Sequence, residues 1–248
     1  MEEGPRPRGL IKKREAAPEL LKWYRKHGRD FIWREEGFSS YGSLIAEMML
    51  QKTQAKVVEP VLKEFLARYP TVESIHRAPR KEIEKLIKRL GLFRTRSKNM
   101  KKVAKIIVEK YGGKVGASMD ELAELPGVGP YVSSAVRCFK GEERVPVLDA
   151  NVARVVGRLY GIDYRDPKHQ KELWGKAEGL LPRKNVKEFN WALIDLGALV
   201  CKPSNPKCGE CPLRSICHVG RDKIALVQSS PTMRKGKRIE FETCTDVV

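Results

Sequence analysis

The chain of 248 residues contains no apolar run near the ~20 residues needed to cross a bilayer. Residues 1–18 are polar and rich in proline, without the hydrophobic core of a signal peptide. These absences predict a soluble intracellular protein, in the cytoplasm or nucleoid, with no membrane partner. Asn and Gln are scarce while charged residues make up 32% of the chain, a composition that favours a thermophilic prokaryote as the source.

Alternation of apolar and polar residues with a period of two is almost absent, so the sequence gives little reason to expect strands. Apolar residues instead recur at spacings of three and four, for example in 17–28, 56–70 and 80–91. The pattern predicts an all-α protein, with Gly91 and Gly112–Gly113 ending helices. Further helices are expected at 97–111, 119–125, 130–139, 149–160, 168–180 and 188–200.

Positive charge dominates the chain. Lysine and arginine number 49 against 31 acidic residues, which gives a formal net charge of +18 and a pI near 9.7. Such a balance favours a polyanionic partner, nucleic acid before membrane. A solvated basic surface with no such partner is the alternative on charge alone.

Four cysteines lie within seventeen residues, at Cys201, Cys208, Cys211 and Cys217, in the order C-x6-C-x2-C-x5-C. In an intracellular protein this density predicts a metal centre, because disulfides would be reduced there. Structural zinc usually draws on two C-x2-C pairs, and only one is present, whereas an iron–sulfur cluster suits one compact loop with uneven gaps. The spacing favours the cluster over zinc.

The stretch "LPGVGPY" at 125–131 predicts a tight turn between two helices. Gly127 and Gly129 can adopt dihedrals closed to other residues, and the helix that follows starts near Pro130 with free N–H groups. Such a turn can bind a DNA phosphate. An ordinary glycine-rich helix connection explains the same seven residues.

Several sequence segments, taken together and in their order along the chain, resemble a known family. These segments are "IWR" at 32–34, "SLIAEMMLQKTQ" at 43–54, "LPGVGPY", "VPVLDANVARV" at 145–155, and the cysteine run. They are similar to the helix-hairpin-helix DNA glycosylase superfamily of endonuclease III and adenine glycosylase, over about residues 18–218. The archaeal thymine/uracil mismatch glycosylases and the adenine glycosylases are the most similar branches.

The resemblance implies a two-domain helix-hairpin-helix glycosylase fold with a C-terminal loop that binds a [4Fe-4S] cluster. Residues 30–143 would form a six-helix domain that contains the hairpin. Residues 1–29 and 144–218 would form a discontinuous cluster domain, and 219–248 a basic tail. The expected partner is double-stranded DNA with a mismatched or damaged base, and the expected state is a monomer.

The same resemblance assigns roles around the hairpin. In this family the hairpin grips the DNA backbone, so Gly127 and Gly129 are expected DNA contacts. Members that also cut the strand place a lysine after the turn as the Schiff-base nucleophile. This chain has Tyr131, which cannot form an imine. We therefore expect a monofunctional glycosylase with weak or no AP lyase activity.

Breaking an N-glycosidic bond needs a proton for the leaving base and negative charge near the sugar. Glu47 is the only charge in the apolar run "SLIAEMML", so burial should raise its pKa and suit it to the acid role. A buried structural carboxylate is the alternative for this residue. Asp149 is the expected negative group, and it can also cap the helix that follows. Tyr131 would close the pocket beside both.

The target nucleotide must leave the duplex to meet these groups. By resemblance, Gln51 would wedge into the base stack and Arg34 would lie near the flipped base. Glutamine and arginine at helix ends are, however, often ordinary surface residues.

The excised base depends on fewer residues. Adenine glycosylases usually carry glutamine where "FNWALIDLGALVC" has Trp191, and they carry a long C-terminal domain that about thirty residues after Cys217 cannot form. We therefore expect removal of thymine or uracil opposite guanine in base excision repair. Adenine removal is the alternative, and Trp191 can equally be core packing. Two functions of other classes are further alternatives. A non-catalytic DNA-binding module would leave the pair Glu47 and Asp149 without a role. An electron-transfer ferredoxin would leave the basic charge and the hairpin without one.

Overall fold

The computed structural model describes residues 16–115, 119–140 and 143–220, and within these ranges it contains helices and no strand. The all-α prediction is confirmed. Gly91 and Gly112 end helical segments with positive φ values of 71° and 58°, as predicted. All but the first two residues of the expected tail at 219–248 lie outside the described residues. The helices are α1 Ala16–His27, α2 Ser40–Leu50, α3 Ala55–Arg68, α4 Val72–Arg77, α5 Arg80–Ile87, α6 Phe93–Tyr111, α7 Met119–Ala123, α8 Pro130–Phe139, α9 Ala150–Tyr160, α10 Gln170–Leu180 and α11 Val186–Leu199.

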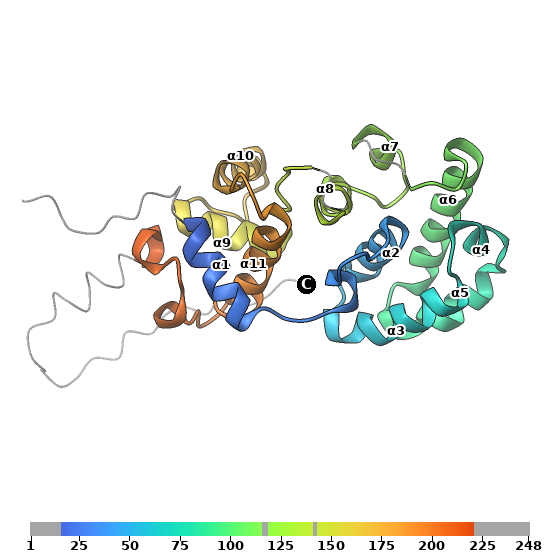
Figure 1. Ribbon diagram of the computed structural model, residues 1–248, viewed down its shortest axis with the longest axis horizontal. Coiled ribbons are helices and arrows are strands. Elements are labelled where there is room, and N and C mark those ends of the chain that lie inside the picture. Colours follow the sequence, from blue (N-terminus) through green and yellow to red (C-terminus); the bar gives the residue numbers. More distant parts are fainter. Residues whose placement is uncertain (1–15, 116–118, 141–142, 221–248) are drawn as a thin grey trace, which may run out of the picture.

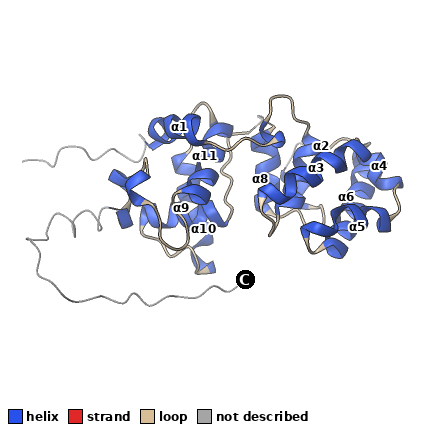
Figure 2. Cartoon of the chain, turned by 90° about the horizontal axis from the view of Figure 1, so that it is seen from below, coloured by secondary structure: helices blue, strands red, loops and turns tan. Residues whose placement is uncertain are grey.

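The helices form two groups along the long axis of the molecule (Figure 1). Helices α2 to α6 lie in one group, and α1 lies with α9, α10 and α11 in the other, as the second view also shows (Figure 2). Helix α8 lies between them. Its residues Val132 and Val136 belong to the hydrophobic core of the α2–α6 group, the first core. Its residues Ala135 and Phe139 pack toward Trp191 of α11. The chain thus starts in one group, crosses to the other and returns.

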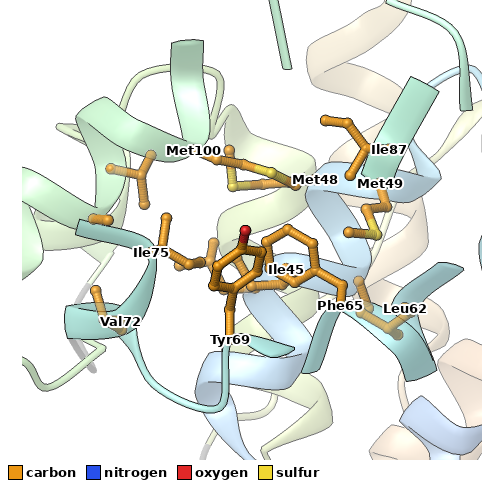
Figure 3. Close-up of a cluster of buried hydrophobic side chains, with 14 of the residues drawn as sticks. Ile45, Met48, Met49, Leu62, Phe65, Tyr69, Val72, Ile75, Ile87 and Met100 are labelled. Atoms are coloured by element: carbon orange, nitrogen blue, oxygen red, sulfur yellow. The ribbon is translucent and has the colours of Figure 1, made fainter. Parts of the chain in front are cut away.

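Helix α2 is the centre of the first core. Every residue from Gly42 to Met49 is buried, so this helix is surrounded by protein on all sides. Its side chains meet Phe65 of α3 and Met100 of α6, both at most 1% exposed (Figure 3). Burying a side chain of this size contributes roughly 1.5–3 kcal/mol. The apolar run that surrounds Glu47 is therefore held in place by the whole of the first core.

The second core draws on both ends of the described chain. Leu20 and Leu21 of α1 pack with Val152 and Val156 of α9 and with Phe189 of α11. Because α1 packs here and not against α2, the early residues and the later helices share one core. This packing supports the proposal of two domains, one formed by residues 30–143 and the other by residues 1–29 together with 144–218.

A buried carboxylate ties the two groups together. Asp195 of α11 is 0% exposed and accepts hydrogen bonds from the backbone N–H of Arg29 at 2.8 Å and from Nη1 of Arg34 at 2.8 Å. The Arg29 guanidinium also donates to it, from Nη2 at 2.7 Å. Both arginines belong to the segment that crosses from α1 to α2. Burial alone would raise the pKa of Asp195, but the hydrogen bonds and charge of Arg34, with those of Arg29, hold it below its ordinary value.

Replacing this carboxylate by an amide tests whether its bonds to Arg29 and Arg34 stabilise the protein. Asp195→Asn leaves the buried guanidinium of Arg34 and the partly exposed one of Arg29 without a counter-charge. Breaking a buried pair costs about 3–5 kcal/mol. We expect a large fall in the guanidinium-chloride unfolding midpoint. Glu188→Gln is the matched control, because Glu188 pairs with Arg25 at a surface site where Arg25 is 60% exposed, and such pairs contribute at most about 1 kcal/mol. Equal midpoints for the two variants would contradict the prediction.

Candidate active site and cluster-binding loop

A cleft of about 990 Å³ opens between the two groups of helices. Its walls include Glu47 from α2, Tyr131 from α8, Asp149 from the start of α9 and Trp191 from α11. The fold thus brings to one cleft residues that lie more than 140 positions apart in the chain. Arg34 and Gln51 line the same cleft.

Glu47 lies in the last turn of α2 and is 3% exposed. The Tyr131 hydroxyl donates a hydrogen bond to its Oε2 at 2.8 Å. Burial raises the pKa of Glu47 to about 7, and nearby Asp149 acts in the same direction, while the hydrogen bond from Tyr131 and the charge of Arg34 act against it. A carboxyl group with this pKa holds and releases a proton near neutral pH.

Tyr131 owes its place to the turn that precedes it. Gly129 caps α8 and Pro130 is its first residue, so Tyr131 is in the first turn with its side chain directed toward Glu47. Burial, followed by the charges of Glu47 and Asp149, holds the pKa of Tyr131 well above its ordinary value. The phenol therefore stays protonated and acts as a hydrogen-bond donor.

Asp149 both caps a helix and faces the cleft. Its Oδ1 accepts from the backbone N–H of Val152 at 2.7 Å, and its Oδ2 accepts from Nδ2 of Asn151 at 2.9 Å. Burial raises the pKa of Asp149, while these hydrogen bonds and the charge of Arg154 act against it. The carboxylate is thereby fixed in one orientation at the cleft wall.

The hairpin between α7 and α8 uses its two glycines differently. Gly127 has a φ of +80°, and a Cβ there would lie 2.7 Å from Nδ2 of Asn99, so both the backbone and the neighbouring side chain favour glycine. Gly129 has φ −91° and ψ −176°, an extended conformation open to any residue. The expectation of unusual dihedrals at both glycines is therefore wrong for Gly129. An added Cβ at Gly129 would meet nothing within 4 Å.

Arg34 and Gln51 make contacts that the sequence did not predict. The Arg34 guanidinium donates to both oxygens of Asp195, at 2.8 and 2.9 Å, and its charge also faces the Trp191 ring at 5.5 Å from the centroid. The Gln51 side chain donates from Nε2 to the carbonyl of Gly127 at 2.8 Å, which joins the end of α2 to the hairpin. Arg34 is thus a fixed part of the wall, and Gln51 is a surface group held by the turn.

Trp191 is both core and cleft wall. The residue is 8% exposed, and its ring packs 5.4 Å from that of Phe139 and under Nζ of Lys187 at 4.8 Å. Its indole N–H is buried and makes no hydrogen bond within the described part of the chain. At this position the wall therefore presents an aromatic surface and no exposed polar group.

Leu92 is a surface feature that the sequence reading missed. It is 60% exposed and is the one exposed large apolar side chain among the described residues. Its φ is +50°. With Gln51 and Lys52 it lines a hollow of about 370 Å³. The available signal was an apolar residue directly after Gly91, between two helices.

The four cysteines follow α11 in a loop that packs on the second core. Cys201, Cys211 and Cys217 contact this core, and Cys208 begins a short 3₁₀ turn, Cys208–Glu210. Burial is the main cause that raises the pKa of Cys211 to about 12; the charges of the other three thiols act in the same direction, and a hydrogen bond from the Leu213 backbone acts against it. Thiolates crowded in this way require positive charge from a bound metal.

The chemistry of the thiols fits an iron–sulfur cluster. A [4Fe-4S] cluster takes one thiolate at each of four iron corners. The loop supplies four cysteines at uneven spacing, and three of them contact the second core. When bound, the cluster neutralises the thiolates and cross-links the loop.

Two arginines of α9 connect this loop to the cleft. Arg154 donates from Nε to the carbonyl of Cys201 at 2.8 Å and from Nη2 to Oδ1 of Asn151 at 2.8 Å. Asn151 in turn donates to Asp149. One turn later, Arg158 donates to the carbonyl of Lys202 at 2.7 Å. A continuous set of hydrogen bonds therefore runs from the first cysteine to the carboxylate at the cleft.

A helical fold of this topology, with a hairpin, two buried carboxylates in one cleft and a four-cysteine loop, defines a DNA-repair glycosylase of the endonuclease III class. Residues 45–178 match the model of the HhH-GPD superfamily base excision DNA repair protein, and residues 201–217 match the iron–sulfur binding domain of endonuclease III. The chain belongs to the HhH-GPD superfamily of base excision DNA repair proteins. It is a DNA glycosylase and carries the [4Fe-4S] binding motif, as the resemblance implied.

Individual relatives agree with this assignment. The thymine/uracil-DNA glycosylase of Methanothermobacter thermautotrophicus is 35% identical, over 80% of this chain and 90% of the relative. An adenine DNA glycosylase of Buchnera aphidicola is 37% identical over 80% of this chain, which spans only 56% of that relative. The structure of a thermostable thymine-DNA glycosylase superposes with a TM-score of 0.79 at 33% identity, covering 85% of this chain and 97% of the other.

The described chain contains no helix with the length and apolar character of a membrane span.

Removing one of the arginines that hold the loop tests its coupling to the cluster. Arg158 donates to the carbonyls of Lys202 and Pro203, at 2.7 and 2.8 Å, and its Nη1 lies 3.4 Å from Sγ of Cys201. We expect Arg158→Ala to lose iron faster on heating, as followed by iron content and visible absorbance. Lys171→Ala, an exposed basic residue of the neighbouring α10, is the control. Retention of iron at the control's rate would show that the loop does not depend on Arg158.

Proposed function

We propose that this glycosylase is monofunctional and removes thymine or uracil opposite guanine. The observation that carries the proposal is the hydrogen bond from Tyr131 to Glu47 inside the cleft. A phenol occupies the position after the hairpin where strand-cutting relatives would place an amine. Tyr131 therefore donates a hydrogen bond to Glu47, the proposed acid, and offers no amine for imine formation.

The contacts of Glu47 support its role as the general acid. Because the Tyr131 hydroxyl donates to Oε2, the proton of the neutral carboxyl group resides on Oε1, which is left to reach the leaving base. As the N-glycosidic bond breaks, its electron pair goes to the base and this proton neutralises it. The buried setting keeps the acid protonated up to about neutral pH, in keeping with its pKa of about 7.

Asp149 would stabilise the sugar as it gains oxocarbenium character, before water adds to the anomeric carbon. Its two oxygens are held by Val152 and Asn151, so the negative charge does not need to reorganise during the reaction. Every residue given a role in the cleft comes from one chain, and we propose that the enzyme acts as a monomer. Similarity to a thermostable glycosylase also fits a heat-adapted source.

The exposed residues beside the cleft suit extrusion of the nucleotide. Gln51 and Leu92 lie on one face, and an amide and an apolar side chain together can replace a lost base in the stack. Gln51 must then exchange its bond to Gly127 for contacts with DNA. Arg34 would present fixed positive charge in the pocket that receives the base.

Trp191 favours a pyrimidine over adenine. Glutamine at this position would offer an amide donor and acceptor to the base, whereas the Trp191 N–H is buried and the ring presents only an aromatic wall. Adenine release stays the second candidate, because the chain is 37% identical to an adenine DNA glycosylase. The polar edge of adenine, buried against this wall, would lose its hydrogen bonds to water without replacement, at a cost of about 1–3 kcal/mol.

A base-release assay decides between the two candidates. End-labelled duplexes with G·T, G·U, A·G and A·8-oxoguanine pairs are incubated with the enzyme and then divided into alkali-treated and untreated samples. We expect cleavage of the thymine or uracil strand, and only after alkali. Adenine release would overturn the assigned base, and cleavage without alkali would overturn the monofunctional assignment.

The pH dependence of base release tests the bond from Tyr131. Because the protonated form of Glu47 is the active acid, the single-turnover rate should fall as pH rises through about 7. The Tyr131 hydrogen bond stabilises the charged carboxylate, so Tyr131→Phe should raise the pKa and move this fall to higher pH. The measurement is the rate profile of the two proteins between pH 5 and 9. An unmoved profile would argue against Glu47 as the titrating group, and Tyr41→Phe, a tyrosine bonded outside the cleft, is the control.

A further inference from the structure

Arg96 is a buried cation that the proposed chemistry does not use. It lies in the first turn of α6 and is 5% exposed. Burying a guanidinium is costly unless hydrogen bonds replace its water. The contacts of this side chain therefore indicate what it is kept for.

All of those contacts lie at the C-terminal end of α2. Arg96 donates to the carbonyl of Met48, to that of Gln51 at 3.2 Å and to Oγ1 of Thr53 at 3.2 Å. The last carbonyls of a helix have no partner within it, and a cation is favourable at this end. Arg96 thus caps the helix that carries Glu47 and ends at Gln51.

Thr53 extends the set of bonds to a second surface turn. Its hydroxyl donates to the carbonyl of Leu90 at 3.0 Å, two residues before the exposed Leu92. Lys52 and Leu92 have φ values of 55° and 50°, and a left-handed conformation at residues other than glycine persists only where neighbouring contacts enforce it. Arg96 and Thr53 supply contacts of this kind to both turns.

We propose that Arg96 is a positioning residue that holds the Gln51 turn and the Leu92 turn as one rigid unit for opening the base stack. The side chains of all three line the same hollow. Arg96 lies behind the surface and acts through Gln51 and Leu92, so it affects nucleotide extrusion and not the breaking of the bond. The inference rests on the proposed role of Gln51 in extrusion.

The test separates extrusion from chemistry. A duplex carries 2-aminopurine beside the target base, and its fluorescence after mixing reports unstacking, while single-turnover quenching reports base release. Arg96 makes charge-assisted bonds to three groups, so we expect Arg96→Met to slow both signals by about ten- to hundredfold. Because extrusion then limits release over part of the pH range, the fall of the release rate with pH should begin at a higher pH than in the wild-type enzyme.

Lys105→Met is the matched control, since Lys105 is an exposed cation of the same helix whose side chain is 63% exposed. Thr53→Val is the second variant, should Arg96→Met fail to fold; it keeps the shape of the side chain and should slow extrusion severalfold. Extrusion at the wild-type rate in a folded variant would overturn the inference, whether or not base release is slowed. No fluorescence change with the wild-type enzyme, or normal extrusion by Gln51→Ala, would instead contradict the proposed extrusion mechanism itself.

Discussion

One buried carboxylate links the two sides of the cleft by hydrogen bonds and charge. Asp195 is on a helix of the second core, and its partners Arg29 and Arg34 are on the segment that enters the first. The same Arg34 then lies close enough to Glu47 and Tyr131 to affect the pKa of both. The same hydrogen bonds therefore join the two groups of helices and influence the electrostatics of the cleft. A burial cost that would be large for any one of these charges is shared among them.

Asp195 and Glu47 look alike in the sequence and end in opposite states. Each is the only acidic residue in an apolar stretch of helix, "NWALIDLGAL" and "SLIAEMML". Two guanidinium groups meet Asp195 and lower its pKa, whereas one phenol meets Glu47 and burial raises its pKa to about 7. Both were detectable as anomalies in the hydrophobic pattern. Which one is a structural anion and which a candidate acid depends on partners more than eighty residues away, and local sequence does not contain that information.

The same limit explains which other features could be predicted. The 3.6-residue period identified most of the helices but not the short α4, since burial of one face is visible in local sequence only over several turns. The cysteine spacing and the segment around the hairpin pointed to the family, because those motifs are short and contiguous. The need for glycine was right at Gly127, whose φ is positive, and wrong at Gly129, whose backbone is extended. The exposure of Leu92 and the capping by Arg96 follow from contacts between α2 and α6, which no local pattern records.

Helix α9 shows how the cluster loop and the cleft are made parts of one element. Its N-cap is Asp149, and Asn151 bonds to both Asp149 and Arg154. Arg154 in the middle of the helix and Arg158 in its last turn bind the backbone at Cys201 and Lys202. A helix is stiff along its axis, so a loop fixed at one end of it constrains the orientation of the cap at the other. A bound cluster would hold the loop against α9. Through Arg154 and Asn151, that loop would then help to fix the carboxylate to which we assign stabilisation of the sugar cation.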